Sequence, residues 1–159
     1  MTLHSLLRYY FAMFLTIQPA TPKDLKSIIT LLNQAHLPLD GFPDDIDVAL
    51  VIRDKVDIIG CAALELYPPF ALLRSIAVVD KWRGNGLGLA LTQAALDEAR
   101  RNGITHVYLL TVTAFDFFLR FGFRAIARAS VPDQVRDSVE FTTACPESAQ
   151  AMVFDFGDS

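Results

Sequence analysis

The chain has 159 residues, of which 52% are hydrophobic and 20% are charged, and its mean hydropathy is +0.34. This length and composition suit a single domain with a sizeable hydrophobic core. Lys and Arg number 14 against 18 Asp and Glu, which gives a net charge of −4. Without a basic stripe or a run of Lys and Arg, the chain is not expected to bind nucleic acid.

Cysteine and histidine usage excludes two further classes of protein. The only cysteines, Cys61 and Cys145, are far apart and fit neither a disulfide scaffold nor a zinc site. We therefore expect a reducing, cytoplasmic location. The three histidines lack the spacing of helical metal ligands, so no metal is expected.

The N-terminus carries an apolar run at residues 9–15. This run is too short to span a bilayer, and it lacks the basic start and cleavage site of a signal peptide, so no membrane association is expected. Because residues 14–17 read as a first strand, we expect Met13 to begin a single domain, 13–159. Residues 1–12 are then a loosely ordered extension, whose apolar character is compatible with a homodimer.

A helix and a hairpin are predicted next. Thr21 at the N-cap and Pro22 at the first helical position precede apolar residues at helical spacing up to Ala35. Residues 37–47 hold two prolines, a glycine and four aspartates, and indicate a loop with room for a short helix. The β-rich runs 49–52 and 56–66, joined at 53–55, predict a hairpin.

A strand, a glycine-rich turn and a helix then follow one another between residues 72 and 103. Gly84, Gly86 and Gly88 lack a Cβ, so the turn can adopt positive φ and its N–H groups can converge before the helix. A helix N-terminus also presents unpaired N–H groups and a partial positive charge. The sequence therefore predicts a phosphate site here. A plain tight turn is the alternative, but three glycines in five residues exceed what a turn needs.

Two common phosphate loops are excluded by spacing. A nucleotide-triphosphatase loop requires a Lys after its last glycine, and none stands there. A dinucleotide loop requires a sixth-position glycine, where Leu89 or Leu91 is found. The remaining pattern is R-G-x-G-x-G at residues 83–88, preceded by an apolar strand.

The rest of the chain predicts one strand at 105–112, a helix at 114–123, a strand at 123–131 and a last strand at 149–156. Hairpins first, then a strand-helix-strand unit, then further strands indicate an α+β fold of three α/β/α layers. We expect a mixed, mostly antiparallel sheet of about six or seven strands with helices on both faces.

The segment 83–88, with its preceding strand and following alanine-rich helix, resembles the pyrophosphate loop of the GNAT superfamily of acyl-CoA-dependent N-acetyltransferases. The segment 114–123 is similar to the closing helix of that superfamily. The resemblance implies a GNAT fold, an N-acetyltransferase activity and acetyl-CoA as cosubstrate. It implies that acetyl-CoA is bound by Ile76, Ala77, Val78, Arg83, Gly84, Asn85, Gly86, Leu87, Gly88, Leu89 and Phe118.

A closer resemblance covers residues 72–152. The segments 72–75, 108–111, 117–118, 131–132, 140–141 and 145–149 resemble the small acetyltransferases of bacterial arsenic-resistance operons, which are similar to the acetyltransferase domain of N-acetylglutamate synthase. This implies a small amino acid, or an amino-acid analogue such as a glutamate-like or arsenic-containing one, as acceptor. The acceptor would meet Arg74, Ser75 and Thr111, with the loop 37–47 nearby.

Two residues depart from the wider superfamily in ways that affect the mechanism. Phe118 stands where many members have a Tyr that protonates the leaving thiolate, and Leu72 stands where many have a catalytic Glu. Neither role is therefore carried over. By resemblance, the backbone N–H of Val78 stabilises the oxyanion. Glu65 is our first candidate for the general base, acting through water, and Asp116 is the second.

Arg74 is the only charge in an otherwise apolar strand, so its guanidinium needs a partner. That partner is either an acceptor carboxylate or a structural carboxylate, Glu65 or Glu140. Both alternatives stay open on the sequence alone.

The predicted function is direct acetyl transfer to a small-molecule amine in a ternary complex, because no Cys-His pairing suggests an acyl-enzyme. Two alternatives are a protein or peptide N-acetyltransferase, and a catalytically silent acyl-CoA sensor. The absent Tyr and Glu favour the sensor to some degree.

Overall fold

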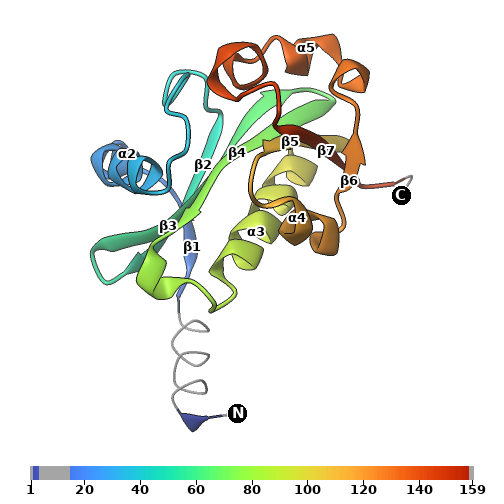
Figure 1. The fold of residues 1–159 in the computed structure, drawn as a ribbon. Helices are drawn as coiled ribbons and strands as arrows, with labels where there is room; N and C mark the ends of the chain where they lie inside the picture. Colours follow the sequence, from blue (N-terminus) through green and yellow to red (C-terminus); the bar gives the residue numbers. More distant parts are fainter. Residues whose placement is uncertain (1, 4–14, 158–159) are drawn as a thin grey trace.

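The computed structural model of the protein describes residues 2–3 and 15–157. Seven strands form one sheet in the order β1-β2-β3-β4-β5-β7-β6, and helices cover both faces of it (Figure 1). This architecture confirms the predicted three-layer α+β fold. The strands are β1 (Ile17–Pro19), β2 (Val48–Asp54), β3 (Asp57–Tyr67), β4 (Phe70–Val78), β5 (His106–Thr111), β6 (Arg124–Ile126) and β7 (Gln150–Asp155).

The helices are α2 (Leu25–Gln34), α3 (Leu87–Arg101), α4 (Phe115–Phe121) and α5 (Asp133–Arg136). Short 3-10 turns occupy Pro22–Asp24, Asp80–Trp82 and Arg128–Ser130, and a π-helical turn occupies Glu140–Ala144. The helix predicted after the glycine-rich turn is α3, which begins within that turn, at Leu87. The predicted extension, 1–12, and the predicted start at Met13 lie almost wholly outside the described residues, and both stay predictions.

All neighbouring strands are antiparallel except β4 and β5, which are parallel. Parallel neighbours need a long crossover connection, and α3 supplies it. The sheet is therefore mixed and mostly antiparallel, as predicted. The hairpin predicted between residues 49 and 66 is β2 and β3, and β4 lies at the middle of the sheet.

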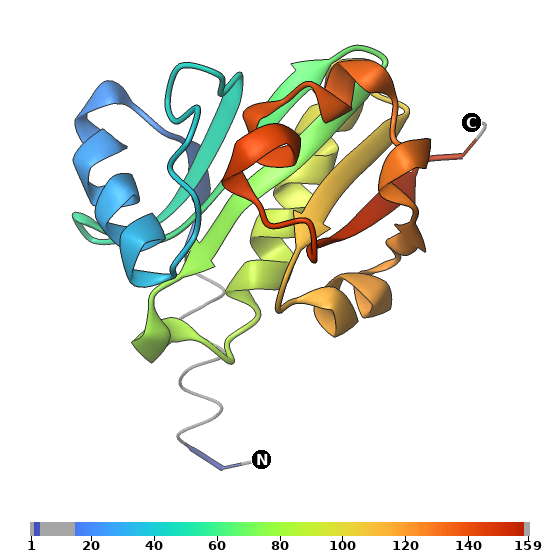
Figure 2. The same ribbon diagram turned by 45° about the horizontal axis from the view of Figure 1, so that its top comes forward.

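Successive residues of a strand point to opposite faces, so each strand feeds two hydrophobic layers. In β2, Leu50 and Ile52 pack with residues of α3, whereas Val51 packs with residues of α2. Figure 2 shows α2 and the segment 128–144 covering one face of the sheet and α3 covering the other.

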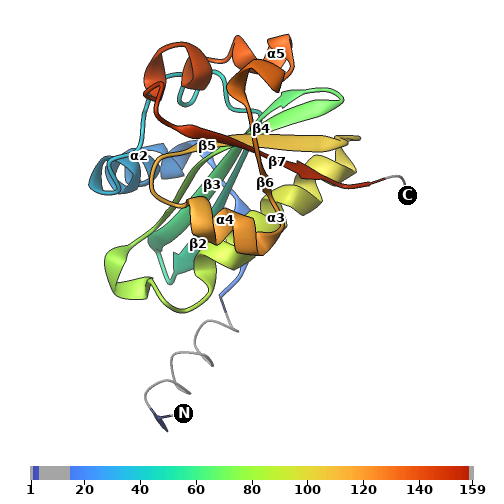
Figure 3. The same cartoon turned by 45° about the vertical axis from the view of Figure 1, so that its right-hand side comes forward.

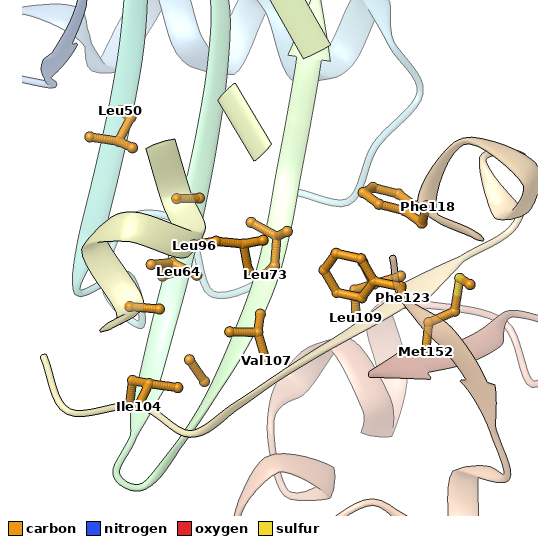
Figure 4. Packing of buried hydrophobic residues seen from close by; sticks show 13 residues of the cluster. Leu50, Leu64, Leu73, Leu96, Ile104, Val107, Leu109, Phe118, Phe123 and Met152 are labelled. Atoms are coloured by element: carbon orange, nitrogen blue, oxygen red, sulfur yellow. The ribbon is translucent and has the colours of Figure 1, made fainter. Parts of the chain in front are cut away.

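The largest buried cluster lies under α3 and α4, which run beside each other on one face (Figure 3). Phe118 of α4 meets Phe123 edge-to-face, with ring centroids 5.4 Å apart. Leu64, Leu73 and Leu96 fill the space between the sheet and α3 (Figure 4). This packing fixes the position of α4 relative to the ends of β4 and β5.

The sequence predicts a strand over residues 123–131, but β6 covers only Arg124–Ile126, so the predicted length was wrong. In the described part of the chain, β6 pairs only with β7, which begins at Gln150, and Ile126 already pairs with Ala151. The pairing of the two strands therefore ends close to Ile126. Instead, Arg128 turns the chain toward the C-terminal segment by donating hydrogen bonds to the carbonyls of Phe141 and Pro146, both at 3.0 Å.

Asp24 ties the start of α2 to the sheet. Its carboxylate receives two hydrogen bonds from Arg53 on β2, at 2.7 and 2.6 Å, and one from the backbone N–H of Thr21 at 2.8 Å. Chiefly because of the hydrogen bond from Arg53, the pKa of Asp24 falls from 3.8 to about 2. The ionised form of Asp24 is thus favoured in the folded protein.

Replacing Asp24 with Asn is expected to lower the free energy of unfolding by about 1–3 kcal/mol at neutral pH, because hydrogen bonds to a charged group are lost. Since the pKa of Asp24 is lowered on folding, its contribution is complete above its usual pKa of 3.8 and is lost as pH falls through about 2. Urea unfolding at neutral and acidic pH measures this. If the difference in the free energy of unfolding between Asp24→Asn and wild type is the same at neutral and acidic pH, the prediction is contradicted.

Candidate active site

Strands β4 and β5 separate along their length. They pair only from Phe70 to Leu72 and from His106 to Tyr108, although β4 continues to Val78. A cavity of about 840 Å³ opens between the separating strands. Its walls come from the second half of β4, the glycine-rich turn, the end of β5, α4, the start of the 35–47 loop and residues 140–146.

Beyond Leu72, the edge of β4 that faces the cavity has no strand partner among the described residues. Val79 donates its N–H to the carbonyl of Ile59 on β3, at 2.9 Å. Because successive N–H groups of a strand point to opposite sides, the N–H of Val78 points toward β5, which no longer pairs there. One extra residue in β4 forms a bulge beside Ser75, whose φ is +60°. Such bulges re-aim the strand and often lie next to functional sites.

The glycine-rich turn ends at the N-terminus of α3, a 15-residue helix. Gly84 and Gly86 have φ of +80° and +78°, and a Cβ built on either would meet no atom within 4 Å. No side chain of residues 2–3 or 15–157 caps this end of α3, so its first N–H groups stay available. An open, positively polarised end of this kind fits the negative pyrophosphate of CoA.

The residues predicted to bind acetyl-CoA come together around the cavity. All of them line it except Asn85, whose side-chain amide instead donates to the Trp82 carbonyl at 2.8 Å and braces the turn. The predicted acceptor residues Arg74, Ser75 and Thr111 also line it. The hydroxyl of Thr111 accepts a hydrogen bond from the N–H of Ala114 at 2.9 Å and thereby holds the start of α4.

Arg74 forms the centre of a buried network. Its Nη1 donates to Glu65 at 2.8 Å, its Nη2 donates to the carbonyl of Asp40 at 2.7 Å, and its Nε lies 3.4 Å from Glu140. The side chain of Arg74 is fully buried. All three guanidinium nitrogens are therefore engaged within the protein, which favours the structural alternative for Arg74.

Glu65 lies behind Arg74 and does not line the cavity. Its Oε2 accepts from Arg74, and its Oε1 accepts from Ser138 Oγ at 2.8 Å and from the Tyr67 hydroxyl. Burial and the bond to Glu65 raise the pKa of Tyr67. The role of Glu65 as a base stays a prediction, while its geometry suits holding Arg74 in place.

Several cavity residues were not predicted to belong to the site. His36 follows α2, and Glu140 and Cys145 lie near the C-terminus. Glu140 and Cys145 fall in segments that carry the closer family resemblance, and Glu140 was also named as a possible structural partner of Arg74. Their position depends on long-range packing that no local pattern encodes.

Neither cysteine is poised as a nucleophile. Burial raises the pKa of Cys61 to about 12, and its Sγ lies 3.3 Å from the carbonyl of Ser75. Burial and the neighbouring Glu140 raise the pKa of Cys145 to about 12 as well. Because the thiolate is the reactive form, both thiols are protonated at neutral pH.

Alkylation of both cysteines by iodoacetamide is expected to be strongly slowed in the native protein at mildly alkaline pH. The reason is the small thiolate fraction at Cys61 and Cys145, together with the burial of Cys61. Mass spectrometry of native and urea-unfolded protein gives the two rates. Equal rates at Cys145 in both states would show that its thiol is not held protonated.

A comparison with protein families identifies the chain. The model described as "Acetyltransferase (GNAT) family" matches residues 11–123. The chain belongs to the GNAT acetyltransferase family.

The uncharacterized N-acetyltransferase CT2212 of Chlorobaculum tepidum is 33% identical to this chain over 95 residues, which make up 58% of this chain and 58% of that protein. An amino-acid acetyltransferase of Mannheimia succiniciproducens is 32% identical over 135 residues, 79% of this chain and 30% of that protein. The GNAT chain thus spans less than two thirds of the length of both relatives.

Solved GNAT structures share the fold. N-acetylglutamate synthase from Neisseria gonorrhoeae, complexed with coenzyme A and N-acetyl-glutamate, superposes with a TM-score of 0.76 at 19% identity, covering 91% of this chain and 36% of that one. Rv2747 from Mycobacterium tuberculosis, in complex with CoA and NLQ, has a TM-score of 0.76 at 21% identity, covering 89% of this chain and 99% of that one.

Two further observations concern the described part of this GNAT chain. Within residues 2–3 and 15–157, no three or more His, Cys, Asp and Glu side chains are grouped so that they could hold a metal ion. No helix in the same ranges is both long enough and apolar enough to cross a membrane.

Proposed function

We propose that this GNAT chain is an acetyl-CoA-dependent N-acetyltransferase that transfers the acetyl group directly to the amine of a small amino acid or amino-acid analogue. The observation that carries the proposal is the open edge of β4, which meets the uncapped N-terminus of α3 at one cavity. An extended thioester arm fits along such a strand edge while its phosphates reach the helix.

Each part of the cavity has a separate task. The N–H groups at Gly84 to Gly88 hold the pyrophosphate, and the β4 edge orients the arm that carries the thioester. The N–H of Val78 donates to the thioester oxygen and stabilises the negative charge that develops on it. Phe118 of α4 lines the same cavity and contributes an apolar wall to it. When bound, acetyl-CoA supplies an acyl group activated by its thiol leaving group.

We assign the acceptor to the part of the cavity that is lined by the 35–38 segment, Ser75, Thr111 and residues of 140–146. Relatives include amino-acid acetyltransferases, and a fold neighbour was solved with N-acetyl-glutamate. These names support an amino-acid acceptor for this chain, and the closer family resemblance adds glutamate-like and arsenic-containing analogues.

The test is release of free thiol from acetyl-CoA by the purified chain, with a panel of amino acids that includes glutamate and its arsenic- and phosphorus-containing analogues. Turnover with one member, above the rate without acceptor, is expected. Turnover only with peptides would replace the small-molecule acceptor with a peptide one. Acetyl-CoA binding without turnover of any amine would favour the catalytically silent sensor. Leu72 and Phe118 agree with that alternative, because they replace the Glu and the Tyr that many superfamily members use in catalysis.

A further inference from the structure

Glu140 occupies a special place in the cavity. It is the only Asp or Glu among the described residues that line the cavity, and its side chain is 6% exposed. Glu65, the other carboxylate next to Arg74, does not reach the cavity wall. An acceptor ammonium in the cavity therefore meets a single carboxylate.

The carboxylate of Glu140 is only weakly engaged by the protein. Its Oε1 lies 3.4 Å from Arg74 Nε, and its Oε2 accepts a hydrogen bond from Cys145 Sγ at 3.3 Å. The contact with Arg74 is long for an ion pair, and the thiol of Cys145 is a weak donor at any distance. In contrast, both oxygens of Glu65 accept hydrogen bonds of 2.8 Å or shorter. Glu140 thus keeps the capacity to accept a proton from a bound amine.

The backbone around Glu140 is held firmly. Arg128 donates to the carbonyls of Phe141 and Pro146, both at 3.0 Å, and its guanidinium lies 5.4 Å from the centre of the Phe141 ring. The π-helical turn between them closes with a bond from Cys145 N–H to the Glu140 carbonyl at 3.1 Å. Single π turns of this kind are frequent at functional sites.

We propose that Glu140 is the general base for the acceptor amine, a role that rests on the proposed function. Glu140 takes one proton from the acceptor ammonium. The freed lone pair forms the C–N bond with the acetyl carbon, and the C–S bond breaks with its electron pair passing to sulfur. The second nitrogen proton goes to that sulfur to give CoA thiol, and Glu140 returns its own proton to solvent.

The charges around Glu140 are consistent with this role. Burial raises its pKa above the usual 4.5, with Glu65 and Asp40 acting in the same direction, while Arg74 and the Cys145 thiol act against it. A base whose pKa is shifted toward neutrality accepts a proton from an ammonium more readily. Because only the ionised form acts as the base, the rate is expected to fall as pH drops through this raised pKa.

The test compares Glu140→Gln with Glu65→Gln in the full chain, using the panel amino acid that wild type acetylates fastest. For Glu140→Gln we expect kcat to fall by at least about a hundredfold and the acidic limb of the pH–rate profile to disappear. The Kd for acetyl-CoA and the melting temperature are expected to stay near wild type. Glu65→Gln is expected to lower the melting temperature but to keep the acidic limb.

The outcomes separate this proposal from the function beneath it. If wild type acetylates no amine, the proposed function fails. If wild type is active and Glu140→Gln keeps its acidic limb with kcat within about threefold, the base assignment is overturned and the function stands. If only Glu65→Gln loses the acidic limb of the pH–rate profile, Glu65 is the general base and the assignment to Glu140 is wrong. Glu140→Asp, which keeps the carboxylate but shortens the side chain, is expected to restore part of the activity and the limb.

Discussion

Replacing Arg74 with Ala is expected to lower the free energy of unfolding by about 3–5 kcal/mol, because removing one partner of a buried ion pair leaves an uncompensated charge. Glu65 is the partner most affected, since its side chain is only 1% exposed and lies 2.8 Å from Arg74. The carbonyl of Asp40 also loses a donor at 2.7 Å. Urea unfolding at neutral pH measures the loss.

Arg53→Ala is a control for Arg74→Ala, because Arg53 also pairs with a carboxylate but its side chain is 27% exposed. A smaller loss in the free energy of unfolding than for Arg74→Ala is expected there, because water screens a partly exposed ion pair. Adding Glu65→Gln to Arg74→Ala removes the buried carboxylate that has lost its partner, and it is expected to recover part of the stability. If Arg74→Ala is as stable as wild type but has a raised KM for an acidic acceptor, Arg74 binds the substrate carboxylate and the structural assignment is wrong.

Replacing Gly86 with Ala is expected to raise the Kd for acetyl-CoA by at least about tenfold, equivalent to 1.4 kcal/mol. Gly86 lines the cavity, and an added Cβ meets no protein atom within 4 Å, so we expect the methyl group to compete with the pyrophosphate for that space. The φ of +78° also strains any residue with a Cβ and shifts the N–H groups that hold the phosphate. Calorimetric titration with acetyl-CoA measures the effect.

Gly103 provides a matched control at the other end of α3. Its φ is +77°, and a Cβ there would also meet nothing within 4 Å. Gly103→Ala and Gly86→Ala are therefore expected to lose similar stability, about 1 kcal/mol each, while only Gly86→Ala loses acetyl-CoA affinity. Equal Kd values for the two variants would contradict the assignment of the pyrophosphate to the N-terminus of α3.

Local chemistry explains which elements could be predicted from the sequence. Thr21 with Pro22 marks the start of the helical segment that leads into α2, and the glycine-rich turn followed by apolar spacing predicts α3. The mixed sheet follows from the order of hairpins and the single strand-helix-strand unit. These signals lie within a few residues of the features they specify.

Features that depend on distant partners were harder to predict. The length of β6 is set by where β7 begins, more than twenty residues later in the chain. Whether Arg74 meets a substrate or a structural carboxylate depends on three segments that converge on it, which contribute Asp40, Glu65 and Glu140. Arg128 helps to hold the turn that carries Glu140, because it donates a hydrogen bond to the carbonyl of Phe141. No local periodicity carries that information.

The most direct test of the account follows the acetyl group itself. The purified chain is incubated with acetyl-CoA that is isotopically labelled in its acetyl group and with the amino-acid panel, and both acceptor and protein are analysed by mass spectrometry. We expect the label on the acceptor nitrogen, matched by released CoA thiol, and no label on Cys61 or Cys145. Label retained on either cysteine during turnover, or thiol release without a labelled acceptor, would contradict direct transfer within the cavity between β4 and β5.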